Sequence, residues 1–250
     1  MQYLNIFNIL IILTLNFSDK TSNNEMTAQE VIDKSILYAG VDKVANSEIS
    51  FKFRDINYAA IRNNGNFKLY RSQKKENTTI NEVITNDGYE RLINAKPVIL
   101  DATMVSKYSN SINSVHYFSV LPYGLNDKAV HKKLLPSSTI KGKEYYKIEI
   151  TFSEDGGGED FEDVFIYWIG KDDFLIDYLA YSYHTNGGGK RFRVLKEQCN
   201  IEGIRFVDYH NYKPTHKSIK LIDIDKAFEK NQLKKVSEIV LKDIEVKLLK

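Results

Sequence analysis

The stretch from Ser138 to Tyr212 constrains the fold more than any other part of this sequence. It reads as five β-strand patterns joined by tight turns, with no helical periodicity among them. It also holds 15 of the chain's 30 aromatic residues. Such a run predicts a curved sheet that forms a shell around a cavity or helices, rather than a scaffold for a catalytic cluster.

The central strand of this stretch, Val164 to Ile169, has an apolar or aromatic side chain at every position. Successive side chains of a strand point to opposite faces, so both faces of this strand must be covered. The sequence therefore predicts helices on the concave side of the curved sheet.

Helical and hairpin patterns precede this stretch. A helix is predicted from Thr27, which has capping-box spacing to the glutamate three residues later, to a stop at Gly40. Four or five antiparallel strands are predicted over 48–95. Their hairpin turns fall at 63–65 and 86–88, because Asn and Gly tolerate positive φ.

The segment between the two strand regions reads as helical. Apolar residues over 104–115 fall on one helical face, and a second short helix is predicted over 126–135, where a proline ends it. The apolar, aromatic linker 116–125 is expected to fold against the sheet or into its mouth. A short helix near 221–228 and a last strand over 238–248 complete the pattern.

This order of elements predicts a mainly β (α+β) fold. We expect a single curved antiparallel sheet of about 9–11 strands, a half-barrel, that wraps internal helices. No linker or internal repeat divides residues 27–250, so they are predicted to form a single domain.

The same order resembles that of the LolA-type periplasmic lipoprotein carriers, and the resemblance covers residues 27–248. It implies a half-barrel with an apolar cavity. The chain more closely resembles a family of uncharacterised exported proteins common in Bacteroidota, through residues 113–126, 141–148, 156–168 and 203–209. That family has no assigned reaction. Its members often have a lipid-anchor cysteine near the N-terminus, which this chain lacks.

The first residues indicate export. Residues 4–17 are mostly apolar, and this length suits a signal peptide better than a membrane span, which needs about 20 residues. We expect a signal region over 1–17, a disordered linker over 18–26, and an exported, periplasmic or envelope-associated protein with no integral membrane span after signal removal. The alternative is a buried N-terminal element or a misassigned start codon.

The charge balance argues against nucleic acid as a partner. The 35 basic and 33 acidic residues are spread along the chain and give a formal net charge of +2, so no basic patch is predicted. The single cysteine, Cys199, excludes an intramolecular disulfide. No motif indicates a cofactor, and none is expected.

Aromatic residues near the predicted mouth of the half-barrel are candidate ligand contacts. His116, Tyr117 and Tyr123 border the aromatic linker and would line an entrance if that linker folds into the mouth. Core packing is the alternative. The strand residues Trp168 and Tyr181 are also predicted to contact the ligand.

Asp208 and His210 are two residues apart on one predicted strand, so they share a face with Ile204 and Phe206. A carboxylate and an imidazole in an apolar cavity can bind a polar ligand group or act as an acid–base pair. They are therefore the candidate catalytic residues as well as candidate ligand contacts. The alternative is a hydrogen-bonded pair near the rim of the sheet.

The acidic loop from 154 to 163 is the strongest local charge signal. Its Gly-rich run offers oxygen ligands to a hard cation such as Ca²⁺, with Asp155, Glu159 and Asp160 as candidates. The spacing is not that of an EF-hand, and a solvated turn is the alternative. Alternate turns of a meander share one end of the sheet, so this loop is expected beside the basic strand start at 190–193.

No catalytic motif is evident: a nucleophile elbow, a phosphate-binding loop and a dinucleotide fingerprint are all missing from the sequence. The run of strands also contradicts the alternating pattern of a (β/α)₈ aldolase.

The sequence favours an exported, non-enzymatic protein that holds an apolar or amphipathic ligand, such as a lipid or a lipidated segment, in the half-barrel. The alternatives are an envelope hydrolase or isomerase using Asp208 and His210, and an envelope structural module with a solid core. The identity of the ligand, the partner proteins and the oligomeric state stay open.

Overall fold

The computed structural model describes residues 26–155, 161–184 and 187–250. The helices are α1 (Ala28–Tyr38), η1 (Val41–Asn46), α2 (Ala102–Ser119), η3 (Leu221–Asp223) and α3 (Ile224–Glu229). The strands are β1 (Ser47–Phe53), β2 (Ile56–Asn63), β3 (Asn66–Lys75), β4 (Thr78–Thr85), β5 (Gly88–Ile93), β6 (Lys96–Pro97), β7 (Val130–Ile140), β8 (Lys143–Phe152), β9 (Val164–Gly170), β10 (Ile176–Tyr183), β11 (Gly189–Ile201), β12 (Ile204–Pro214), β13 (Leu233–Ile239) and β14 (Lys242–Leu248).

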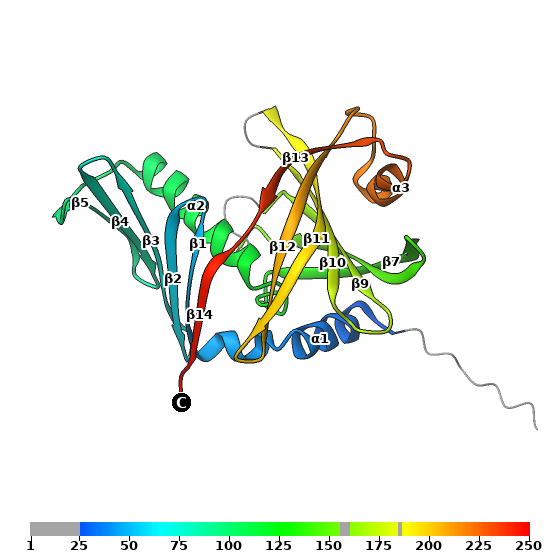
Figure 1. The fold of residues 1–250 in the computed structure, drawn as a ribbon, viewed down its shortest axis with the longest axis horizontal. Coiled ribbons are helices and arrows are strands. Elements are labelled where there is room, and N and C mark those ends of the chain that lie inside the picture. The colour runs from blue at the N-terminus through cyan, green and yellow to red at the C-terminus, as the bar shows by residue number, and fades with distance from the viewer. Residues whose placement is uncertain (1–25, 156–160, 185–186) are drawn as a thin grey trace, which may run out of the picture.

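Within the described residues, hydrogen bonding arranges the strands in two seven-stranded antiparallel sheets. The first sheet has the order β14-β1-β2-β3-β4-β5-β6, and the second has the order β13-β12-β11-β10-β9-β8-β7. Figure 1 shows α2 running from the first sheet toward the second, while α1 lies along one end of the molecule and α3 lies outside the second sheet. The expected mainly β, antiparallel class with internal helices is confirmed.

The structure differs from the expected single sheet because the chain changes sheets near its C-terminus. Strand β13 pairs with β12 and ends at Ile239, and β14 begins at Lys242 and pairs with β1. At the crossing the Oδ1 atom of Asp208 accepts a hydrogen bond of 2.9 Å from the backbone N–H of Leu241. The predicted last strand over 238–248 is therefore two strands, one in each sheet.

The first helix forms as its sequence predicts. The hydroxyl of Thr27 accepts from the N–H of Glu30 at 3.2 Å, and the Glu30 carboxylate accepts from the N–H of Thr27 at 2.7 Å. The α1–η1 turn follows at Gly40, where φ is +66° and a side-chain Cβ would overlap the carbonyl oxygen of Gly203. Only glycine fits this close approach between α1 and the β11–β12 hairpin.

The central strand β9 is covered on both faces, as its composition predicts. Phe165, Tyr167 and Ile169 pack in a cluster with α1, whereas Ile166 and Trp168 pack in a second cluster with α3. Each of these five residues is at most 8% exposed. Helix α1 against one face and helix α3 against the other together explain the unbroken apolar pattern of this strand.

The prediction of a helix over 126–135 is wrong. Residues Val130–Ile140 form β7, the edge strand of the second sheet, and Pro136 falls where the pairing with β8 is irregular. A proline lacks the N–H that a central strand needs, but an edge strand with a bulge tolerates it. Helix α2 instead extends to Ser119, so the start of the predicted aromatic linker is helical.

The predicted signal region and nearly all of the predicted linker lie outside the described residues. Within the described part of the chain, no helix combines the length and apolarity needed to cross a membrane.

A buried ion pair fastens α3 to the second sheet. The Nζ atom of Lys147 in β8 lies 3.1 Å from Oδ2 of Asp225 in α3, and the indole N–H of Trp168 donates to the same oxygen at 3.1 Å. Lys147 also donates to the carbonyl oxygen of Ile222. Burial lowers the pKa of Lys147, because desolvation disfavours the charged amine more than the Asp225 carboxylate favours it.

Replacing Asp225→Ala is expected to lower the free energy of unfolding by about 3–5 kcal/mol, because the Lys147 cation is left buried without its partner. Urea unfolding followed by circular dichroism measures this loss. The control is Lys52→Met, which removes an exposed ion pair with Asp243 and should cost at most about 1 kcal/mol. Equal losses in the two variants would contradict the stated role of the buried pair.

Candidate functional site

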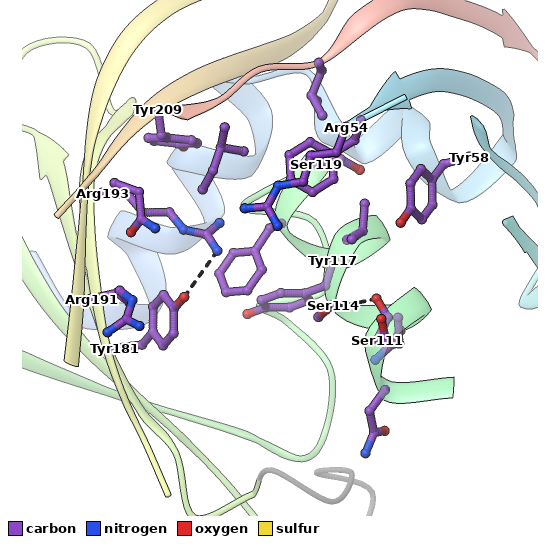
Figure 2. Close-up of a pocket in the computed structure, with 18 of the residues that line it drawn as sticks. Arg54, Tyr58, Ser111, Ser114, Tyr117, Ser119, Tyr181, Arg191, Arg193 and Tyr209 are labelled. Carbon is purple, nitrogen blue, oxygen red and sulfur yellow. Dashed lines mark hydrogen bonds between the residues drawn. The ribbon is translucent and has the colours of Figure 1, made fainter. Parts of the chain in front are cut away.

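A cavity of about 860 Å³ lies between α2 and the two sheets. Its walls come from β1, β2 and β3 of the first sheet, from α2, and from β8 to β13 of the second sheet. Figure 2 shows side chains from all three sides extending into this space. We call it the inter-sheet pocket.

Helix α2 presents a polar side to the inter-sheet pocket. Residue Ile112 on its other side is fully buried against Ala60 and Leu69 of the first sheet. Short polar side chains of the helix therefore line the pocket: Asn110, Ser111, Asn113 and Ser114. Small side chains on this side leave open space between the helix and the second sheet.

An aromatic wall, centred on Phe165 of β9, joins the second sheet to Phe118 at the end of α2. The ring centroid of Phe165 lies 5.7 Å from that of Phe152, 6.1 Å from that of Phe118 and 5.6 Å from that of Tyr181. These rings form a continuous apolar surface along one side of the inter-sheet pocket.

Arg193 of β11 places a buried cation in this aromatic wall. Its guanidinium lies 3.8 Å from the ring centroid of Phe118, and its Nη2 atom donates to the hydroxyl of Tyr181 at 3.4 Å (Figure 2). The residue is only 8% exposed. Its buried Nε–H has no acceptor among the described residues, and none of their ion pairs includes Arg193.

Three further arginines line the inter-sheet pocket, and one of them, Arg71, is paired with the buried Glu82. Arg191 donates to the carbonyl oxygen of Lys190 at 3.0 Å and lies over the ring of Tyr183. Arg54, from the turn between β1 and β2, enters from the first sheet, and Figure 2 shows it and Arg193 extending into the pocket from opposite sides. The pocket therefore combines an apolar wall with cations from both sheets.

A pair of tyrosines closes the pocket beneath α2. The hydroxyl oxygens of Tyr117 in α2 and Tyr167 in β9 lie 3.1 Å apart. Burial raises the pKa of Tyr117 to about 12 and also raises that of Tyr167. Both phenols therefore stay neutral at physiological pH, and they join the helix to the second sheet by a hydrogen bond.

Comparison with known proteins decides the family. The sequence profile of a family of unknown function (DUF6503) matches residues 5–240. The chain belongs to this family. No curated protein matches the sequence of this DUF6503 chain.

Solved structures include proteins of the expected superfamily. A LolA superfamily protein of Nitrosomonas europaea matches with 13% identity and a TM-score of 0.47, covering 90% of this chain and 94% of that protein. A DUF1329 family protein of Desulfovibrio piger matches with 11% identity and a TM-score of 0.42, covering 89% and 92%. The function of this DUF6503 chain is therefore argued from its own residues.

Three of the predicted ligand contacts line cavities. Tyr117 and Tyr181 line the inter-sheet pocket. Tyr117 also borders a second, smaller cavity, and Tyr123 lines that second cavity. The aromatic linker thus folds inward as expected, although its first four residues do so as the end of α2.

His116 does not line either cavity. It is 1% exposed on the first-sheet side of α2, where its Nε2 atom donates to the carbonyl oxygen of Tyr70 at 3.1 Å. The rings of Phe51 and Tyr58 meet it edge-on. His116 is therefore a core residue, as the core-packing alternative described. Neighbouring residues in one turn of α2 face opposite sheets, so a residue next to a pocket residue can lie in the core.

Trp168 faces away from the inter-sheet pocket. It is fully buried under α3 on the outer face of the second sheet, where it contacts Phe192 and Asp225. Residues of β9 alternate between the faces, so Phe165 and Tyr167 take the inward positions. The sequence shows that the residues of this strand alternate between its two faces, but it does not show which face points toward the inter-sheet pocket.

Asp208 and His210 also lie off the inter-sheet pocket. The face of β12 that lines it holds Val207, Tyr209 and Asn211. Asp208 accepts from the N–H of Leu241, and burial raises its pKa. The Nδ1 atom of His210 lies 3.3 Å from Oε1 of Glu238 in β13. Both side chains contact the neighbouring segment at the edge of the sheet. A ligand in the inter-sheet pocket would therefore not contact Asp208 and His210 as an acid–base pair.

The middle of the acidic loop, residues 156–160, lies outside the described residues. Asp155 is exposed, and Glu159 and Asp160 belong to the part of the chain that the structure does not describe. Asp163 lines the inter-sheet pocket near the basic strand start, and its Oδ1 atom lies 3.3 Å from Nδ1 of His184. Among the described residues no group of three or more potential ligands is arranged for a metal ion.

The arginines of the pocket were not predicted as site residues. The signal in the sequence was the pair Arg191 and Arg193, two apart on one strand and therefore on the same face. The pair was assigned to an exposed rim because charged side chains usually stay in solvent. Burial of Arg193 depends on β11 facing α2, which the sequence alone does not give.

The buried His116 predicts a specific pH dependence. Burial lowers its pKa from 6.5 to about 4, so between these values the unfolded chain binds a proton that the folded protein does not. Stability is complete above about pH 6.5 and should fall by about 3 kcal/mol as the pH approaches 4. Urea unfolding from pH 7 to 4 measures this change.

The variant His116→Gln removes this titration, so its stability should fall less over the same pH range. The variant His131→Gln, at an exposed histidine, is the control and should keep the dependence of the unaltered protein. If His116→Gln and the unaltered protein lose stability in parallel, the stated burial of a neutral imidazole is wrong.

Proposed function

We propose that this protein binds an anionic amphipathic ligand, with its acidic group at Arg193 and its apolar chain along the aromatic wall of the inter-sheet pocket. The observation that supports this most is the Arg193 guanidinium, which is buried in the pocket without a carboxylate partner among the described residues. A ligand carboxylate or phosphate would supply that partner.

The energetics of buried charge favour this assignment. Moving a guanidinium out of water costs several kcal/mol, and a neutral tyrosine hydroxyl at 3.4 Å offsets only part of it. The planar guanidinium can make two parallel hydrogen bonds to a carboxylate or phosphate. Arg54 and Arg191 add positive charge at the same pocket.

The size and lining suit a lipid-like molecule. The volume of about 860 Å³ lies within the usual range for small-molecule sites, roughly 300–1,000 Å³. Each methylene buried against Phe118, Phe152 and Phe165 is worth about 0.8 kcal/mol. An open pocket of this volume argues against a structural module with a solid core.

Export remains part of the proposal. The apolar N-terminal stretch supports a signal region, and the resemblance to LolA-type carriers supports a place in the cell envelope. The position of Asp208 and His210 on the far face of β12 favours binding over hydrolysis or isomerisation. We therefore propose a carrier or sensor of an acidic lipid rather than an enzyme.

Fluorescence titration with 11-(dansylamino)undecanoic acid tests the proposal. The probe should brighten and saturate, and palmitate or a lysophosphatidic acid should displace it. The two competitors separate a carboxylate head group from a phosphate head group. Hexadecanol, which has the same chain length as palmitate but no charge, should compete at least tenfold less well.

The variant Arg193→Met should weaken palmitate binding about tenfold to a hundredfold, since a hydrogen bond to a charged group contributes about 1.5–3 kcal/mol. Binding of hexadecanol should change little. The matched control is Lys190→Met on the same strand, at a residue that does not line the pocket. Absence of saturable probe binding, or equal losses for palmitate and hexadecanol, would overturn the proposal.

A further inference from the structure

A second cavity of about 460 Å³ lies on the other side of α2. It is bounded by β2, β3 and β4 of the first sheet and by the segment after α2. The two cavities meet along one stripe of the helix, formed by Asn110, Asn113 and Tyr117. Its remaining walls are distinct from those of the inter-sheet pocket, and we call it the α2–sheet cavity.

Arg62 of β2 is a buried cation in the α2–sheet cavity. The residue is 8% exposed, and its buried Nη1 atom has no hydrogen-bond acceptor among the described residues. Its guanidinium lies 5.4 Å from the ring centroid of Tyr123. None of the ion pairs in the described part of the chain includes Arg62.

The contact with the Tyr123 ring stabilises the buried charge of Arg62 only weakly. A cation–π contact returns less than the desolvation of a guanidinium costs. Another buried charge on this sheet, Glu82, is paired with both Arg71 and Arg91 at 2.6 and 2.9 Å. Arg62 has no equivalent partner, although it lies on the same buried face.

Other charges around the α2–sheet cavity define the ligand. Among the described residues that line it, Arg62 is the one cationic side chain and Asp127 is the one carboxylate. Asp127 is exposed, in the segment that follows Tyr123, and it is not paired with Arg62. A single negative charge therefore matches Arg62, whereas a phosphate, with a charge of about −1.5 to −2, would leave an excess of negative charge beside Asp127.

We propose that the α2–sheet cavity is a separate binding site for a small monocarboxylate, with the carboxylate held by Arg62. The apolar part of the molecule packs against Tyr123, Leu69 and Ile84, which line the same cavity. This site is independent of the acidic lipid proposed for the inter-sheet pocket.

Isothermal titration calorimetry with hexanoate tests this proposal. All titrations use the Arg193→Met variant, which lacks the arginine proposed to bind a carboxylate in the inter-sheet pocket. Hexanoate should bind this variant at one site, while hexanamide, its uncharged analogue, should bind at least tenfold more weakly. Arg62→Met should abolish the hexanoate signal, and Arg62→Lys, which keeps the charge but loses the planar fork, should weaken it severalfold. Asp127→Asn should strengthen it.

The shared background and one control separate this site from the inter-sheet pocket and from general charge effects. Because every titration uses the Arg193→Met background, in which the inter-sheet pocket lacks its proposed carboxylate partner, a failure of the lipid proposal does not affect this test. Lys68→Met, which removes an exposed cation of β3, should leave hexanoate binding unchanged. The proposal is overturned if hexanamide binds as well as hexanoate, if Arg62→Met and Arg62→Lys both bind normally, or if inorganic phosphate binds more tightly.

Discussion

The fixed position of α2 between the two sheets is the constraint on which the rest of the structure depends. Two polar contacts hold the helix on the first sheet: Arg71 donates to the Ser111 hydroxyl at 2.9 Å, and His116 donates to the Tyr70 carbonyl at 3.1 Å. A hydrogen bond between the hydroxyls of Tyr117 and Tyr167 ties it to the second sheet. Directional bonds on both sides fix the rotation of the helix, and this rotation determines which side chains face each cavity.

The two cavities are a direct consequence of that rotation. A helix with small polar residues on one side cannot fill the space between two diverging sheets, so volume remains on each side of it. Each volume contains one arginine that is 8% exposed and lacks a carboxylate partner among the described residues, Arg193 in one and Arg62 in the other. Buried cations of this kind cost stability unless an anion joins them. Both proposed sites therefore have the same feature, a buried arginine that an acidic ligand would pair, and they lie on either side of a single helix.

The sequence predicted the fold well where local signals were strong. The capping box at Thr27, the hairpin turns and the doubly apolar strand at 164–169 were all read correctly, because each depends on short-range chemistry. The site residues were harder to predict, because the face of a strand that points inward is determined by the arrangement of the whole sheet. Trp168 and Asp208 were assigned inward but lie on outer positions, whereas Tyr117 and Tyr181 do line the inter-sheet pocket. Burial of Arg193 was missed because nothing near it in the sequence marks an arginine as interior.

Native mass spectrometry of the protein, purified without detergent from the cells that make it, tests the central claim most directly. The account predicts a population heavier than the polypeptide by the mass of one acidic lipid. That population should be lost in Ser114→Trp, a change that fills the inter-sheet pocket from α2, and kept in Lys190→Met. The polypeptide mass alone, or a lipid adduct that persists in Ser114→Trp, would contradict it.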